Sequence, residues 1–169
     1  MNEAYKPPDQ PSSEHSRETV YLAHAREEGQ LADMEDIAKR GICFMCPESI
    51  PEFYEERGGL IDEGEYSYLV YNGYPYEGTQ HHIMAIPKKH VTRLEDVSAE
   101  FWQEALNFFQ ELEKELNITG GSIAMRFGNP AETGATAHHI HIHFIVPNKD
   151  LGPDDKPVRF RMSRSFKDH

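Results

Sequence analysis

The strongest pattern in the chain is a strict alternation of histidine and apolar residues over residues 139–144. Branched and aromatic residues fill the positions between the histidines and a proline ends the run, so a β-strand is predicted over residues 137–147. Successive side chains of a strand point to opposite faces, so His139, His141 and His143 should share one face and line one groove. Such a row of imidazoles can hold an anion chain, such as a polyphosphate, or a metal ion. The other face should be apolar, with Ile140, Ile142 and Phe144.

Shorter patterns predict the remaining elements. Strands are expected over residues 65–72, 81–86, 122–127 and 157–162. Apolar residues at helical spacing predict an N-terminal helix over residues 18–40 and a central helix from a Ser98 cap to about Asn117. Several strands with one central helix are typical of an α+β fold with an antiparallel sheet.

The chain divides by composition into four parts. Residues 1–17 are rich in Pro, Ser, Glu and Gln and are expected to form a flexible arm. The helix of residues 18–40 is expected to pack on the folded domain of residues 41–163, and residues 164–169 form a short tail. A chain of 169 residues with 38% hydrophobic residues and a mean hydropathy of −0.69 indicates one domain with a modest core. Dimerisation would bury further surface.

Charge and targeting signals exclude several classes of protein. The formal net charge of −12 argues against broad binding to nucleic acids or anionic membranes, so a substrate phosphate would need a local site. No apolar run approaches the roughly 20 residues of a membrane span, and the N-terminus lacks the apolar core of a signal peptide. We therefore expect a cytoplasmic protein without membrane or nucleic-acid partners.

Two further segments carry candidate chemistry. Cys43 and Cys46 are spaced as one half of a tetrahedral zinc site, although two buried thiols or a redox pair fit the same spacing. The loop of residues 128–134 contains Gly and Thr residues and leads directly into the histidine strand. Exposed backbone N–H and hydroxyl groups of such a loop can form a cradle for phosphate.

The run His139-Ile-His-Ile-His-Phe-Ile145 resembles the signature of the histidine triad (HIT) superfamily of nucleotide hydrolases and transferases. The resemblance extends from about Cys43 to Pro147. It includes Asn72-Gly-Tyr-Pro-Tyr and His82-Ile-Met-Ala-Ile-Pro-Lys-Lys-His90, which are similar to the first hairpin of the family. The resemblance implies an α+β, HIT-like fold with a five-stranded antiparallel sheet, and commonly a homodimer with one continuous ten-stranded sheet.

The resemblance also implies roles for the histidines. His141 would be the nucleophile that attacks the α-phosphorus of a nucleotide and forms a nucleotidyl-histidine intermediate. Neutral imidazole suits this role, because its ordinary pKa of about 6.5 leaves it mostly unprotonated at pH 7. The backbone carbonyl of His139 would accept a hydrogen bond from the other ring nitrogen of His141. His143 would contact phosphate oxygens or the bridging atom.

Further residues are implied to bind the substrate. Asn72 matches the family residue that binds the ribose, and Thr136 matches a Ser or Thr that contacts phosphate or the leaving group. Thr133 and Gly134 belong to the candidate phosphate loop. The family has Asn or Gln eleven residues before the first histidine, where this chain has Gly128, so Asn129 is expected to take over that contact.

Some family branches bind structural zinc through Cys-x-x-Cys and two histidines. The matching residues here are Cys43, Cys46, His90 and His139. Two thiolates and two imidazoles would complete a tetrahedral site with no open position, so the zinc would be structural. No organic cofactor is expected.

The leading hypothesis is a nucleotide hydrolase or nucleotidyltransferase acting on dinucleoside polyphosphates or nucleoside phosphoramidates, with a purine nucleotide such as an adenine nucleotide expected. One alternative is a nucleotide-binding HIT-fold protein with little turnover. Another is a DNA-end deadenylating enzyme related to aprataxin. The net charge and the lack of an evident C-terminal zinc finger disfavour the latter.

Overall fold

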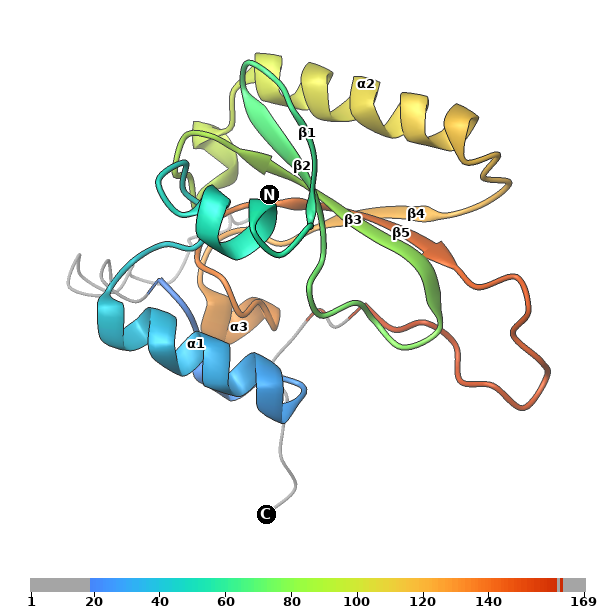
Figure 1. Ribbon diagram of the computed structural model, residues 1–169, viewed down its shortest axis with the longest axis horizontal. Helices are drawn as coiled ribbons and strands as arrows, with labels where there is room; N and C mark the ends of the chain where they lie inside the picture. The colour runs from blue at the N-terminus through green and yellow to red at the C-terminus, as the bar shows by residue number, and fades with distance from the viewer. Residues whose placement is uncertain (1–18, 161, 163–169) are drawn as a thin grey trace, which may run out of the picture.

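The computed structural model describes residues 19–160 and 162, and its centre is one antiparallel sheet with the strand order β1-β2-β3-β5-β4 (Figure 1). The predicted arm of residues 1–17 and tail of residues 164–169 lie outside the described residues. The five strands confirm the predicted α+β class and the five-stranded sheet. They are β1 Leu60–Glu63, β2 Ser67–Tyr71, β3 Thr79–Pro87, β4 Ser122–Met125 and β5 Ile142–Pro147.

The histidine strand is shorter than predicted. It begins at Ile142, so His139 and His141 precede it. The reason lies in backbone hydrogen bonds to segments outside the sheet. The His138 N–H donates to the Thr19 carbonyl (3.0 Å) and the Ile140 N–H donates to the Val91 carbonyl (2.8 Å). This part of the chain is held by loops and does not follow the strand period.

Two other strand predictions need correction. β1 was not predicted, because its four residues do not alternate between apolar and polar types. The predicted final strand over residues 157–162 is wrong for the described residues, since 157–160 and 162 belong to no strand. Phe160 instead lies against the ring of His143, with 5.4 Å between the ring centroids.

The N-terminal helix starts later than predicted. α1 spans Glu28–Arg40, while residues 22–24 form a single 3-10 turn. Before that turn, Val20 forms a bridge with Ala137, which holds the chain extended. As predicted, Gly41 ends the helix, with a left-handed φ of 62° that glycine adopts without strain.

The central helix, α2, spans Ala99–Glu115 and covers one face of the sheet (Figure 1). Its predicted cap is present, because the Ser98 hydroxyl oxygen accepts from the Phe101 N–H at 3.2 Å. Apolar residues of α2 pack on the apolar side of the histidine strand. The Phe109 ring stacks on the Phe144 ring, with 5.0 Å between the ring centroids. No helix among the described residues is both long and apolar enough to cross a membrane.

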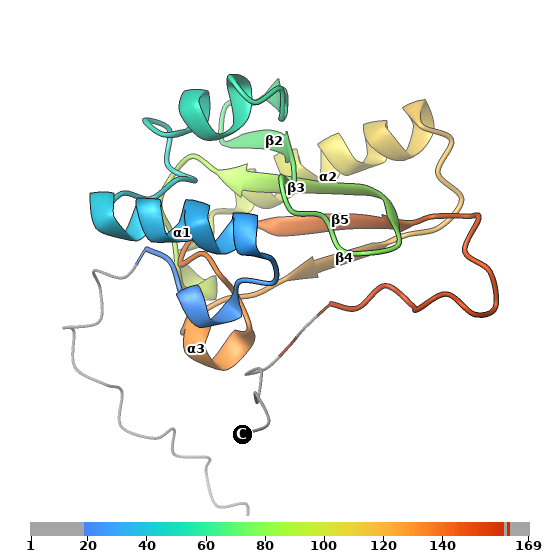
Figure 2. The same ribbon diagram turned by 60° about the horizontal axis from the view of Figure 1, so that its bottom comes forward.

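The opposite face of the sheet lies under α1, the π-helical turn Pro51–Glu55 and the short helix α3, Pro130–Thr133 (Figures 1 and 2). Met34 and Ile37 of α1 belong to the core on this side, together with Met84 of β3. Met84 pairs directly with His143 in the sheet. Directly paired residues share a face, so His143 projects toward the α1 side.

Candidate active site

A cavity of about 530 Å³ lies between α1 and the sheet, and this volume is typical of small-molecule sites. One part of its lining is apolar and aromatic, with Met34, Ile37, Phe44, Phe53 and Met84. Another part is polar, with Arg26, Asn72, Tyr76, Arg126, His141 and His143. The cavity therefore offers separate surfaces for an apolar ring and for charged groups.

His141 is held as a neutral imidazole with one defined tautomer. Its Nδ1 lies 2.8 Å from the backbone carbonyl oxygen of His139. A carbonyl only accepts, so Nδ1 carries the proton and Nε2 keeps its lone pair. Burial lowers the pKa of His141 to about 4, which leaves the ring unprotonated at neutral pH. His141 lines the cavity, so this nitrogen can act as a nucleophile there.

His143 presents a proton donor, because a chain of hydrogen bonds fixes its tautomer. The Tyr76 backbone N–H donates to His82 Nδ1 (3.1 Å), so the proton of neutral His82 is on Nε2. That N–H donates to His143 Nδ1 (2.9 Å), which leaves the His143 proton on Nε2. Burial lowers the pKa of His82 to about 3 and lowers the pKa of His143 well below its ordinary value. Both rings are therefore neutral.

His139 does not join the other two histidines in the cavity. Its Nε2–H donates to the Pro87 carbonyl (3.1 Å), and its Nδ1 lies 3.3 Å from Cys43 Sγ. The prediction that three imidazoles line one groove is therefore wrong for His139, because the loop before β5 breaks the strand alternation. What His139 offers to the cavity side is its backbone carbonyl.

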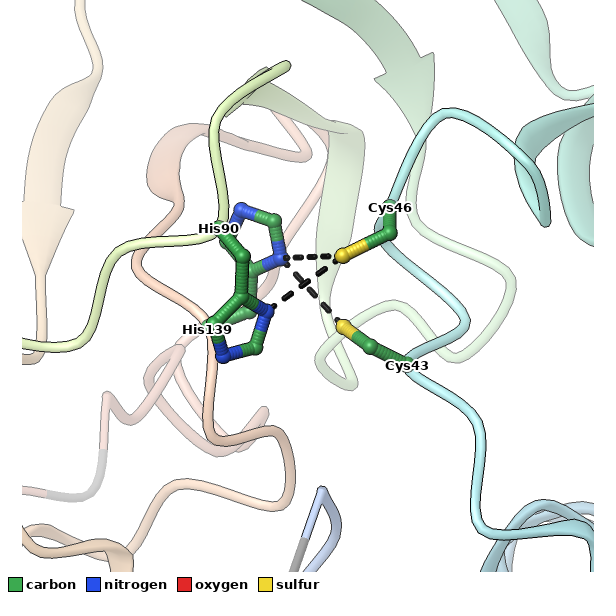
Figure 3. A group of neighbouring side chains, drawn as sticks. All are labelled: Cys43, Cys46, His90 and His139. Atoms are coloured by element: carbon green, nitrogen blue, oxygen red, sulfur yellow. Dashed lines mark hydrogen bonds between the residues drawn. The ribbon is translucent and has the colours of Figure 1, made fainter. Parts of the chain in front are cut away.

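The four predicted metal ligands come together from three loops (Figure 3). Cys43 and Cys46 follow α1, His90 follows β3, and His139 precedes β5. Their ligand atoms all lie within 4.8 Å of one another, and Cys46 Sγ is 3.3 Å from His90 Nδ1. Zinc bond lengths of about 2.3 Å to sulfur and 2.0 Å to nitrogen give sulfur–nitrogen separations of roughly 3.5 Å around a tetrahedral ion. The donor set and its spacing fit such an ion.

The two thiols would be neutral at neutral pH if no cation lay beside them. Burial raises the pKa of Cys43, and burial with the negative charge of Cys43 raises the pKa of Cys46 to about 12. Holding both as thiolates at neutral pH therefore requires a positive ion beside them. The hydrogen bond from His139 Nε2 to Pro87 fixes the tautomer that leaves Nδ1 free to bind that ion.

The predicted substrate residues divide into two groups. Asn72, Gly134 and Thr136 line the cavity, whereas Asn129 and Thr133 do not. Asn129 caps α3 through its side-chain oxygen, which accepts from the Ala131 N–H at 3.0 Å. Thr133 donates from its hydroxyl to the Asn129 carbonyl at 3.3 Å. These two residues make hydrogen bonds within α3, the short helix that directly precedes Gly134 and Thr136. Their predicted contact with substrate is therefore not supported.

Four residues of the site were missed by the sequence analysis: Arg26, Tyr76, His82 and Arg126. Arg126 donates to the Tyr76 hydroxyl (3.1 Å), and the guanidinium of Arg26 lies over the Tyr76 ring, 4.5 Å from its centroid. Tyr76 and His82 lie within the segments compared with the family, and Arg126 lies in the predicted strand of residues 122–127, so these three could have been singled out. Arg26 lies outside the segment that carries the resemblance and gave no signal.

A family model identifies the domain. The model described as HIT domain matches residues 58–150, which is more than half of the chain. The protein belongs to the HIT domain family. The match lies inside the predicted domain of residues 41–163, and it leaves out α1 and the two cysteines.

The relatives of this HIT protein include an enzyme from Mycobacterium tuberculosis. "AP-4-A phosphorylase" of strains CDC 1551 / Oshkosh and ATCC 25618 / H37Rv is 31% identical over 102 residues, which are 58% of this chain and 50% of the relative. The chain thus spans about half the length of these curated relatives.

Solved structures give similar matches. A Zn-bound histidine triad family protein from Mycobacterium smegmatis is 27% identical, with 63% of this chain and 73% of that chain covered and a TM-score of 0.44. A HIT family hydrolase from Clostridium thermocellum is 21% identical, with 59% of this chain and 90% of that chain covered and a TM-score of 0.46.

Proposed function

We propose that this HIT protein is a nucleotide hydrolase or nucleotidyltransferase that works through a nucleotidyl-His141 intermediate. The observation that carries this proposal is the hydrogen bond from His141 Nδ1 to the His139 carbonyl, which leaves Nε2 unprotonated. Nε2 attacks the α-phosphorus, and the bond from phosphorus to the leaving group breaks. His143, with its proton on Nε2, donates toward the bridging atom as charge develops there. Water or another acceptor then displaces His141.

The cavity supports a purine nucleotide as the substrate. Its apolar lining suits a base, and Asn72 lines the same cavity, which supports its proposed contact with the ribose. The name of the mycobacterial relative, AP-4-A phosphorylase, favours dinucleoside polyphosphates among the expected substrates, with nucleoside phosphoramidates as the second class.

A turnover assay separates this proposal from its alternatives. The protein is incubated with a fluorogenic nucleoside phosphoramidate and with a dinucleoside polyphosphate, and release of nucleotide is followed. Turnover of either supports the enzyme, whereas tight binding of both without turnover indicates a nucleotide-binding protein. Salt-dependent binding to DNA would instead favour the DNA-end enzyme.

Removal of the Asn72 side chain should weaken nucleoside binding by roughly 1–3 kcal/mol, because buried ribose hydroxyls lose a partner. Asn72→Ala should then bind a nucleotide and its ribose-free phosphate analogue with equal affinity. The Asn72 side-chain oxygen also accepts from the Tyr74 N–H (2.9 Å), so Asn72→Asp is the control that keeps this turn. Calorimetric titration measures both affinities. If Asn72→Ala prefers the nucleotide as strongly as wild type, the ribose contact is elsewhere.

We also propose that the Cys43, Cys46, His90 and His139 cluster holds a structural zinc ion. All four positions are taken by protein ligands, so the ion would stabilise the fold and would not bind substrate. It would connect the segment after α1 to the loop that carries His139, whose carbonyl orients His141.

A homodimer is the expected assembly, and light scattering at micromolar concentration should give twice the mass of the chain. β1 and β4 form the edges of the sheet, and Ile123 on β4 is 55% exposed. An apolar edge strand of this kind is suited to pairing with a second copy. Ile123→Lys should weaken the dimer through charge repulsion, while Ile118→Val should leave it intact. A monomer mass for the wild-type protein would count decisively against this assembly.

The cytoplasmic location and the absence of membrane and nucleic-acid partners stay predictions from the sequence.

A further inference from the structure

Gln30 is a buried polar residue of α1 that lines the cavity. Only 5% of its surface is exposed. Its side-chain Oε1 accepts a hydrogen bond from the Arg26 backbone N–H at 2.8 Å. Only the oxygen of an amide can accept this bond, so the amide has one orientation, and Nε2 holds two N–H donors on the other side of the group.

The two donors on Nε2 of Gln30 border open space. Among the described residues, every side-chain nitrogen or oxygen that is fully enclosed has a hydrogen-bond partner. Nε2 of Gln30 has no partner in the described part of the chain, so it is not enclosed, and the open space that Gln30 lines is the cavity. An amide that is removed from bulk water with its donors unpaired costs free energy. A ligand with a hydrogen-bond acceptor at this place would remove that cost.

The position of Gln30 on α1 indicates which part of a ligand it meets. Met34 follows four residues later on the same face of the helix and belongs to the apolar part of the cavity lining. Gly29, the residue before Gln30, packs on the Tyr74 ring, because a Cβ at that glycine would lie 3.8 Å from the ring. The Tyr74 N–H donates to the side chain of Asn72. Gln30 is therefore close to the surface suited to a base and to the turn that carries the residue proposed to bind ribose.

We propose that Gln30 recognises the purine base by donating a hydrogen bond from Nε2 to a ring nitrogen. The inference rests on the proposed function, in which a purine nucleotide occupies the cavity. The acceptors of adenine are its ring nitrogens N1, N3 and N7, whereas its exocyclic amine is a donor. Apolar contacts discriminate weakly between bases, while a buried hydrogen bond rejects a base that lacks the acceptor. Gln30 lies outside residues 58–150, so this contact comes from the segment before the matched domain.

Gln30 also has a structural role at the start of α1. Glu27 is the N-cap residue, and the bond from the Arg26 N–H to Gln30 Oε1 stabilises the first turn. Gln30→Glu keeps an oxygen for this bond and replaces the two donors by a second carboxylate oxygen. Gln30→Leu removes the whole amide. Gln110→Glu adds the same charge at an exposed position of α2, which covers the other face of the sheet, and should change no affinity.

Titration calorimetry compares AMP with its 1-deaza, 3-deaza and 7-deaza analogues, in each of which a C–H group replaces one ring nitrogen. The wild-type protein should bind one of the three about tenfold more weakly than AMP, because that analogue leaves the Gln30 donor unpaired. In both Gln30 variants, the affinity for AMP should fall about tenfold or more. The ratio of the affinities for AMP and the sensitive analogue should fall close to one in Gln30→Leu. It should fall below one in Gln30→Glu, because a carboxylate oxygen repels a ring-nitrogen lone pair and tolerates a C–H group.

The ratio separates base recognition from the helix cap. Loss of affinity by the same factor for AMP and all three analogues in Gln30→Leu would overturn the proposal, because it indicates only a structural role. Equal affinity of the wild-type protein for AMP and all three analogues would also overturn it. If the wild-type protein binds AMP and turns over no nucleotide, the proposed catalytic function fails, while the ratio still tests Gln30. No binding of any nucleotide would overturn both.

Discussion

Replacement of His141 by Asn should abolish turnover, with kcat lowered at least about a thousandfold, or roughly 4 kcal/mol in the barrier. The loss follows from the geometry of the ring. Among the three histidines of the motif, only Nε2 of His141 combines an unprotonated lone pair with a place on the cavity, because His139 points to the cysteines and His143 carries its proton on Nε2. The amide of Asn can still donate to the His139 carbonyl, so the fold and the affinity for nucleotide should be kept.

His81→Asn serves as the matched control. Successive side chains of β3 point to opposite faces, so the His81 side chain projects away from the face that carries His82. Activity, circular dichroism and nucleotide affinity are measured for both variants. A kcat above about a tenth of the wild-type value in His141→Asn, a change of under 1.4 kcal/mol or so, would refute the assignment of the nucleophile.

Loss of the metal cluster should have the second-largest effect. Cys43→Ser should lose zinc and about 3 kcal/mol of stability, which lowers Tm by roughly 6–12 °C in a domain of this size, since binding energy at a structural site is folding energy. Activity should also fall, because His139 is both a ligand and the residue whose carbonyl orients His141.

Metal analysis of protein purified without chelator, together with thermal unfolding, checks this result. Near one zinc per chain is expected in the wild-type protein. Chelator should lower its Tm to that of Cys43→Ser and leave the variant unchanged. A redox pair or two buried thiols would be indicated if the wild type carries no metal, or if Cys43→Ser keeps full stability and activity.

Local features of the fold were well predicted from the sequence. The Ser98 cap and the Gly41 end depend on the chemistry of single residues, and both are present. The alternation over β5 correctly separates Ile142 and Phe144, which pack under α2, from His143 on the other face. These features depend on neighbours in sequence, so a sequence pattern contains the information that fixes them.

Features that depend on distant partners were not predicted. The His139 side chain does not line the cavity with His141 and His143. The backbone before β5 makes hydrogen bonds to Thr19 and Val91, which lie far away in sequence. The alternating residues 157–160 form no strand because a strand needs a partner strand, and Phe160 packs on His143 instead. Arg26 lines the cavity because the chain before α1 runs past it, and a pattern of apolar and polar residues does not predict the path of that segment.

The residues of the candidate site also divide into those that the sequence predicts and those whose role depends on distant partners. The metal ligands were predicted from family resemblance, and they come together from three loops. The roles of His82 and Arg126 depend on hydrogen bonds across strands, to His143 and Tyr76. Asn129, which was expected to contact substrate, is used by α3 as its cap, because a short helix starting at Pro130 needs an acceptor at that position.

Detection of the covalent intermediate tests the central claim most directly. Wild-type protein is mixed with a dinucleoside polyphosphate or a nucleoside phosphoramidate, quenched rapidly without acid, and measured by intact-mass spectrometry with peptide mapping. A mass increase of one nucleotidyl group on the peptide at His141, absent in His141→Asn, is the predicted result. Turnover by the wild-type protein with no adduct under single-turnover conditions, or an adduct on another residue, would contradict the account.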